Sequence, residues 1–216
     1  MGPRGVPRPY QRRRSRPMIV TVSVLFVISV VVWSVVLVNA AGRSGAASCP
    51  PPPSGSVPGE VLASDALNSV TPVPPNAVRV RVLNAGGQRG QANLVAAQLG
   101  DLGFAEAATP SNDPLYPNGN LNCRGQLRFG QGGEGAAATL ALVLPCTELV
   151  RDDRGDNTVD VAVGTAFADV NPSKTVRDVL DQLANPAAAN TDNGQAAPAA
   201  PAVDPSTLDN ARNTSC

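Results

Sequence analysis

Apolar and polar positions alternate most clearly at the start of the stretch VRVRVLNAGGQRGQANLVAAQLGDLGF, residues 78–104. Valines alternate with arginines over Val78–Leu83, which predicts a strand with one buried face. Over Gln88–Leu102 the apolar side chains recur at helical spacing and form one stripe: Ala92, Val95, Ala96, Leu99 and Leu102. Gly103 suits the position after a helix, and Phe104 begins a second short strand. The order predicts a βαβ unit with a right-handed crossover.

The pattern after this unit is weaker but still predicts alternating elements. A polar loop is expected at 108–125, and short strands are expected at 126–129, 147–150 and 158–163. A polar turn at 151–157 would join the last two strands. Residues 134–144 suit a buried helix or a buried strand, and their Ala and Leu content favours the helix. A last helix is expected from the N-cap Asn171, with Pro172 at its first position. The predicted fold is a small α/β domain, built on a βαβ unit with a mixed sheet.

An uncharged apolar run, MIVTVSVLFVISVVVWSVVLV, occupies residues 18–38. At about 1.5 Å per residue a helix of this length spans about 31 Å, which is enough to cross the hydrocarbon core of a membrane. All six charges before it are arginines, so the positive-inside rule places the N-terminus in the cytoplasm and the later residues outside. A cleaved signal ending at Val38-Asn39-Ala40 and a lipidated Cys49 remain open alternatives, but the length of the run favours an uncleaved anchor.

This gives five expected regions. They are a cytoplasmic Arg/Pro-rich tail at 1–17, a transmembrane helix at 18–38, a Pro/Gly/Ser-rich linker at 39–76, a folded domain at 77–185 and a low-complexity tail at 186–216. The protein is therefore expected in the cell membrane as a single-pass protein with an extracytoplasmic C-terminal domain.

Four cysteines, Cys49, Cys123, Cys146 and Cys216, lie on the predicted outer side. An even number in an oxidising compartment predicts two disulfides, which can pair in three ways. Cys123 and Cys146 each precede a predicted strand, and a helix lies between those strands. If the strands are parallel neighbours, both cysteines lie at one sheet edge, which favours Cys123–Cys146 and leaves Cys49–Cys216. A terminal Cys216 in such a bond would tie the tail back to the domain.

The composition excludes several kinds of chemistry. The chain has no histidine, which removes Ser-His-Asp and Cys-His catalysis and histidine metal sites. The aspartates of residues 152–160 miss the calcium-loop pattern because Arg154 occupies the third position, so a solvated hairpin turn is expected there. Aromatic residues make up 3% of the chain, and the outer part is acidic, which argues against nucleic-acid binding. We expect no catalytic residues and no metal.

The glycine-rich turn at Ala85–Gly90 resembles a dinucleotide-binding loop that lacks its first glycine, since Ala85 stands there. The domain is also about half the size of a dinucleotide-binding sheet, so no nucleotide cofactor is expected. A turn between strand and helix needs glycines for structural reasons alone. The backbone amides before the helix, with Arg89 beside them, could nevertheless receive a phosphate or carboxylate of an envelope polymer. The candidate polymer-binding loop consists of Asn84, Gly86, Gly87, Gln88, Arg89 and Gly90.

The same stretch resembles the opening of the LytR C-terminal domain, which has a valine strand, Leu-Asn, a glycine turn and a helix ending in Gly-Phe. The matching residues are Val82, Leu83, Asn84, Gly86 or Gly87, Gly90, Ala92, Ala96, Leu99, Gly103 and Phe104. The later VDVAVGTAF resembles the closing strand of that family, with Gly164 and Phe167 at its end. The resemblance covers about residues 78–167.

The resemblance implies a non-catalytic module at the outer face of the cytoplasmic membrane that supports the integrity of the bacterial envelope. Its expected partners are the membrane and either a wall glycopolymer or wall-assembly proteins. Two alternatives remain: a structural scaffold for envelope synthases that binds no polysaccharide, and a part of a glycopolymer ligase. The chain has no room for the catalytic domain that accompanies this module in many relatives, which disfavours the ligase.

Overall fold

The computed structural model describes residues 2, 16–44, 48–55, 58–185 and 203–213. The chain divides into two compact units, residues 1–44 and 45–216. The first unit contains the helix α1 (Arg16–Ser44), and most of the expected cytoplasmic tail lies outside the described residues. Within the described part of the chain, no helix has both the length and the hydropathy that crossing a membrane requires.

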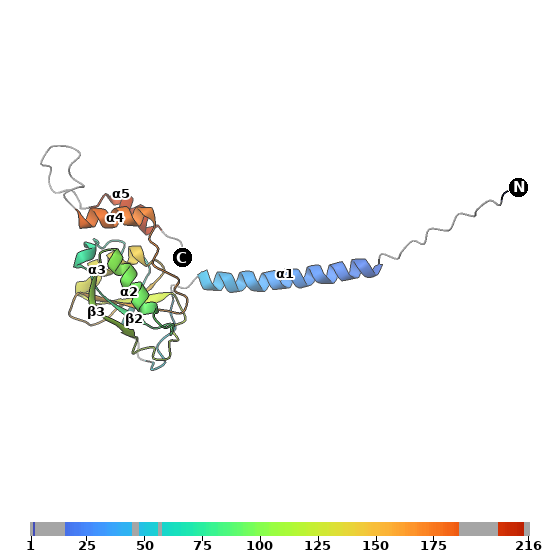
Figure 1. Ribbon diagram of the computed structural model, residues 1–216, viewed down its shortest axis with the longest axis horizontal. Coiled ribbons are helices and arrows are strands. Elements are labelled where there is room, and N and C mark those ends of the chain that lie inside the picture. The colour runs from blue at the N-terminus through green and yellow to red at the C-terminus, as the bar shows by residue number, and fades with distance from the viewer. Residues whose placement is uncertain (1, 3–15, 45–47, 56–57, 186–202, 214–216) are drawn as a thin grey trace. The chain divides into compact units, whose positions relative to one another are not determined.

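The second unit is a mixed sheet with helices (Figure 1). The strands are β1 (Glu60–Leu62), β2 (Arg79–Asn84), β3 (Ala105–Asn112), β4 (Gly125–Phe129), β5 (Glu148–Arg151) and β6 (Thr158–Val163). The helices are α2 (Gln91–Asp101), α3 (Glu134–Val143), α4 (Lys174–Ala184) and α5 (Pro205–Arg212), with short 3-10 turns η1 (Pro75–Ala77) and η2 (Gln131–Gly133). The strand order is β1-β5-β4-β6-β2-β3.

Two parallel units meet at the central strand β6. One is β2-α2-β3, which confirms the predicted βαβ unit, and the other is β4-α3-β5. Strand β6 pairs parallel to β2 and antiparallel to β4, and the short β1 pairs antiparallel to β5. The predicted α/β domain with a mixed sheet is confirmed.

The main hydrophobic core lies between one face of this sheet and the helices. The register sets Val80 beside Val159, and Leu127 beside both Val161 and Leu149, so their side chains share one face. These side chains form one buried cluster with residues of all four helices, including Val95, Leu140, Val179 and Ala211. Burial of these apolar side chains is the dominant stabilising contribution.

Several expected elements differ from the structure in their extent or pairing. The expected loop at 108–125 begins inside strand β3, which runs to Asn112. Strands β5 and β6 do not form a hairpin, because β4 lies between them. Helix α4 begins two residues later than expected: Ser173 is its N-cap, and its hydroxyl accepts a hydrogen bond from the Val176 amide at 3.3 Å.

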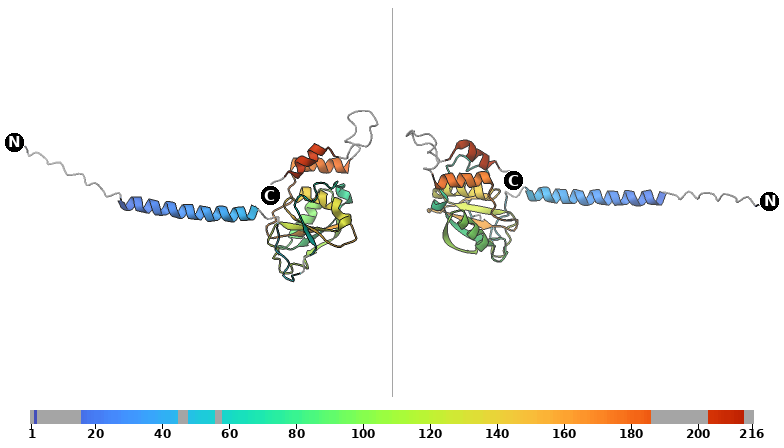
Figure 2. Two further views of the ribbon diagram at one scale, coloured as in Figure 1. Left: turned by 180° about the vertical axis from the view of Figure 1, so that it is seen from behind. Right: turned by 45° about the horizontal axis from the view of Figure 1, so that its top comes forward.

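The segments on either side of the expected domain also belong to the folded unit. In the expected linker, β1 extends the sheet beyond β5, and Leu67 and Pro75 are buried. In the expected low-complexity tail, α5 packs beside α4 (Figures 1 and 2) and buries Val203 and Ala211. Arg212 donates to the carbonyl of Val70 at 2.8 Å, so α5 is also bound to the segment before η1.

Candidate functional site: a polar face and its groove

The predicted disulfide pairing was wrong: Cys49 is bonded to Cys123. Strands β4 and β5 are parallel neighbours as expected, but the cysteines before them lie in different surroundings. Cys123 belongs to a small buried cluster with Tyr116 and Leu121, whereas Cys146 lines a cavity beside α3 and α5. Cys146 is disulfide-bonded as well, and Cys216 lies outside the described residues.

The candidate polymer-binding loop is a tight turn held by Asn84. The Asn84 side chain donates to the carbonyl of Gln88 at 2.7 Å and accepts from the Gly87 amide at 3.0 Å. Gly90 is the N-cap of α2 with φ +78°, a conformation that favours glycine, and a Cβ there would meet no atom within 4 Å. Its glycine is thus explained by backbone conformation and not by close helix–sheet packing.

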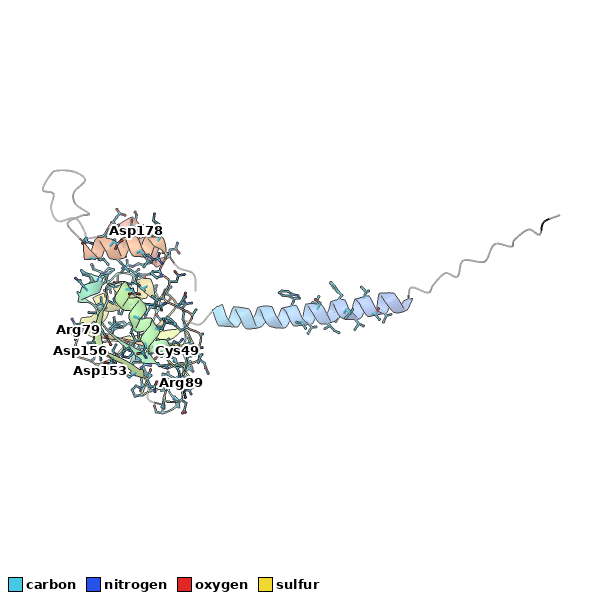
Figure 3. All side chains as sticks on the ribbon, viewed as in Figure 1. Cys49, Arg79, Arg89, Asp153, Asp156 and Asp178 are labelled. Atoms are coloured by element: carbon cyan, nitrogen blue, oxygen red, sulfur yellow. A yellow bond between two sulfur atoms is a disulfide. The ribbon has the colours of Figure 1, made fainter. Side chains whose placement is uncertain are left out.

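The other glycines of this loop pack against two neighbouring loops. A Cβ on Gly86 would lie 2.7 Å from the carbonyl carbon of Gly164, and a Cβ on Gly119 would clash with the backbone of Gly87. The glycine turn therefore has a structural role. Gln88 and Arg89 are exposed at its outer side, and Figure 3 shows Arg89 at the opposite end of the domain from Asp153 and Asp156.

The sheet face opposite the helices carries buried polar side chains. Gln126 and Arg128 of β4 alternate with the core residues Leu127 and Phe129, and Asp160 of β6 alternates with its core valines. Strand alternation directs these polar side chains to the face away from the core. The loop residues Tyr116, Leu121 and Cys123, together with Cys49, cover part of this polar face.

At one end of the polar face, an ion pair between Arg128 and Asp113 is almost completely buried. Their closest contact is 2.7 Å, and their side chains are 3% and 0% exposed. Arg128 also donates to Gln126, which donates in turn to Glu148 at 2.6 Å, while Glu148 accepts from the Cys49 amide. This chain of hydrogen bonds satisfies groups that would be costly to bury unpaired.

A second network surrounds Asp160. Arg81 donates to both carboxylate oxygens of Asp160, at 2.8 and 2.6 Å, and Arg154 bridges Asp160 and Asp152. Burial alone would raise the pKa of Asp160, but hydrogen bonds from Arg154 and Arg81 outweigh it and lower the pKa. The hydrogen bond to Asp160 is the main reason that the pKa of Arg81 is raised. Asp152 and Asp160 are therefore parts of an ion-pair network and not of the solvated hairpin turn that was expected.

The two networks meet in a groove of about 520 Å³. Arg81, Arg128, Arg154, Asp152 and Asp160 line it together with Leu83, Ser111, Asn112, Pro58, Pro114 and Leu115. The groove thus combines charged groups with apolar walls, an arrangement that suits a polar ligand. Among the described residues, no group of three or more acidic or cysteine side chains is arranged to hold a metal ion.

Sequence reasoning did not identify this groove, although one signal for it was present. Arg81, Arg128 and Asp160 each occupy a polar position in a predicted alternating strand, where exposure to solvent is the usual interpretation. Arg128 pairs with Asp113, which comes from the loop after β3, and Asp160 pairs with Arg81 and Arg154. These partners come together only in the folded chain. The loop residues Asn84–Gly90 are not among those that line the groove.

Comparison with known proteins agrees with the domain that the sequence resembles. A family model described as LytR cell envelope-related transcriptional attenuator matches residues 77–167. A second model, the N-terminal domain of carboxypeptidase Rv3627c-like proteins, matches residues 8–61. The predicted LytR C-terminal domain is thus confirmed, and its limits agree closely with the resemblance at 78–167.

Two relatives match beyond this domain. The chain is 43% identical over 181 residues to the cell envelope integrity protein Cei of Mycobacterium tuberculosis, covering 82% of this chain and 83% of the relative. The crystal structure of the soluble domain of a conserved hypothetical secreted protein from Mycobacterium marinum matches with a TM-score of 0.62 and 38% identity, covering 74% of this chain and 100% of that one. The chain belongs to the family of the cell envelope integrity protein Cei.

Proposed function

We propose that the protein is a non-catalytic, single-pass membrane module that supports the integrity of the cell envelope by binding wall glycopolymer or wall-assembly proteins. The membership of the Cei family supports the envelope role. The absence of histidine from the whole sequence supports a role without catalysis. The observation that carries the binding role is the groove, because it offers paired charged groups and apolar walls on the sheet face opposite the described helices of the domain.

The proposed anchor rests on the sequence and on the side chains of α1. Residues 18–38 contain no charged residue, and the arginines that precede them favour a cytoplasmic N-terminus. Large apolar side chains described along α1, such as Leu25, Phe26 and Trp33, are more than half exposed. A helix that is apolar on all sides needs an apolar environment, which a lipid bilayer provides. Alkaline washing of cell membranes should accordingly leave the chain in the membrane pellet.

The binding role is tested with the full chain in mild detergent, with its disulfides intact. The chain should be retained on purified wall fractions, or should crosslink to membrane-bound assembly proteins in cells. Arg89→Ala tests the candidate loop: a contact there predicts retention that is weaker by about tenfold to a hundredfold, since a charge-assisted hydrogen bond contributes about 1.5–3 kcal/mol. Arg177→Ala, at an exposed position of α4, is the matched control and should be retained like the wild type.

Each outcome has a defined meaning. Equal retention of Arg89→Ala and Arg177→Ala would remove the loop from the site and leave the groove. Crosslinking without retention on any wall fraction would identify the scaffold alternative. The absence of both retention and crosslinking would contradict the proposed function.

A further inference from the structure

The groove is electrically balanced, which limits the ligands that it can accept. Three guanidinium groups line or face it, those of Arg81, Arg128 and Arg154, and three carboxylates pair with them, those of Asp113, Asp152 and Asp160. Every one of these charges has an opposite partner within 2.8 Å. The groove therefore presents charged hydrogen-bonding groups without a net charge of its own.

From this balance we infer that the groove binds an uncharged polyhydroxyl ligand, namely neutral sugar residues of a glycopolymer. The inference rests on the proposed function and specifies the ligand of its site. A hydroxyl group is both a donor and an acceptor, so it can add to a paired carboxylate or guanidinium without displacing the partner. Carboxylate oxygens have about four lone-pair sites between them, and Asp160 uses three for its arginines.

Arg81 is the accessible donor of this network. Its side chain is 45% exposed, and it contacts Asp160 through Nε and Nη2, so its Nη1 is not part of that pair. Leu83, Pro114 and Leu115 add apolar surface against which the carbon face of a sugar ring can pack. The volume of about 520 Å³ lies within the usual range for small-ligand sites.

An anionic ligand fits this groove less well. A phosphate or carboxylate would have to compete with Asp152 or Asp160 for arginines that are already paired at 2.6–2.8 Å. Displacement would leave a largely buried aspartate without its partner, which is strongly unfavourable. Asp156 lies close enough to Arg81 and Arg154 to influence the pKa of Arg81, so it adds a negative charge near the rim. A neutral ligand avoids the competition for the arginines, the loss of a partner for the aspartate and the repulsion by Asp156.

The test uses the full chain in mild detergent with intact disulfides. Calorimetry compares short neutral oligosaccharides of glucose, galactose or arabinose with matched glycans that carry a phosphate or a carboxylate. We expect a neutral glycan to bind with an affinity that changes little between low and high salt, because no net charge is screened. Tighter binding of the charged glycans, with strong salt dependence, would overturn the inference.

Two substitutions locate the ligand. Ser111→Trp places a large ring at an exposed position of the groove without removing any member of the ion-pair networks, and should weaken neutral-glycan binding at least about tenfold. Ser69→Trp, an exposed serine beside a different cavity, is the matched control and should bind like the wild type. Circular dichroism verifies that both variants fold. A folded Ser111→Trp variant with unchanged affinity would exclude the groove.

Failure of this inference is distinguishable from failure of the proposed function. If wall fractions retain the chain but no neutral oligosaccharide binds, the ligand class is wrong while the binding role stands. If neither the wall fractions nor the oligosaccharides bind and no assembly protein crosslinks, both proposals fail.

Discussion

The two faces of the sheet are made from the same strands, yet they are held together by different interactions. On the helix-covered face, side chains such as Val80, Leu127 and Val161 form one apolar cluster with α2, α3, α4 and α5. On the polar face, Arg128 and Asp160 lie in ion-pair networks beneath loops and beside a groove. Neighbouring residues of one strand therefore contribute to stability through hydrophobic burial on one side and through mutual pairing on the other.

The apolar contacts of one face and the ion pairs of the other should respond differently to substitution. Hydrophobic burial depends on area and shape, so each apolar side chain contributes largely by itself. A buried ion pair contributes little relative to a well-packed apolar pair, but it is costly to break because one charge is left alone. The polar face should accordingly be sensitive to single substitutions and tolerant of matched double ones. This behaviour is expected of the binding face that we propose.

The largest expected effect compares adjacent residues of β4. Phe129→Ala, on the helix-covered face, should lower the free energy of unfolding by about 3–5 kcal/mol because it leaves a cavity. Arg128→Met should lower it by about 3–5 kcal/mol because Asp113 is left buried without an opposite charge. Adding Asp113→Asn to Arg128→Met should restore more than half of that loss. Urea unfolding with intact disulfides measures all three variants.

The double variant is the discriminating one. An amide at position 113 can still accept the hydrogen bond from the Leu115 amide, which Asp113 accepts at 2.9 Å. If the double variant is no more stable than Arg128→Met, the charge left on Asp113 is not the source of the loss. The proposed difference between the two faces would then be incorrect.

The next largest effect concerns the disulfide that closes over the polar face. Cys49 and Cys123 are separated by 74 residues, so replacing both with alanine should lower the free energy of unfolding by about 2–4 kcal/mol. Hydrogen exchange should quicken in residues 48–55 and 113–123, which contact each other through Cys49–Cys123 and through Tyr116 to the Pro50 carbonyl. Exchange in α2 should quicken less than in these segments, because only the loss of global stability affects it. Equal acceleration in α2 would show that the bond stabilises the whole domain and not the polar face.

The helix-covered face could be predicted well from local sequence patterns. The alternation over Val78–Leu83 and the apolar stripe of the following helix each indicate one buried face. Both elements are present, although the helix begins at Gln91, three residues later than expected. The run of Ala and Leu at 134–144 was correctly interpreted as a helix. The family resemblance also includes core residues of this face, such as Val82 and Leu99.

The polar face could not be predicted in the same way, because its contacts join residues far apart in sequence. Arg81 and Asp160 are 79 residues apart, and Cys49 and Cys123 are 74 residues apart. Strand β1 has only three residues, which is too short for an alternating pattern, and it is formed through its pairing with β5. The disulfide prediction placed cysteines correctly near the starts of neighbouring strands but had no information on where the side chains pack. A polar residue in a predicted strand shows which side chains share its face of the sheet. Whether that face is buried depends on loops that pack on it only in the folded chain.

The smallest expected effect tests the Asp160 network through its pH dependence. The pKa of Asp160 is lowered below the ordinary value of 3.8, so its ionised form stabilises the fold above that pH. Asp160→Asn should lower the free energy of unfolding by about 1–3 kcal/mol at neutral pH, because two arginines lose a charged partner. The difference in the free energy of unfolding between wild type and variant should become smaller as the pH falls below 3.8 and through the folded-state pKa, because wild-type Asp160 then becomes neutral as well.

Urea unfolding at a series of pH values measures this difference. Asp178→Asn, on the exposed side of α4 (Figure 3), is the matched control and should follow the wild-type curve at every pH. A difference for Asp160→Asn that stays constant from neutral to acidic pH would mean that the variant alters packing and not charge. In that case the polar face would resemble the helix-covered face in its energetics, and a charge-balanced groove would lose its main support. A difference that disappears in acid would instead show that ionised Asp160 holds Arg81 and Arg154 in place at neutral pH.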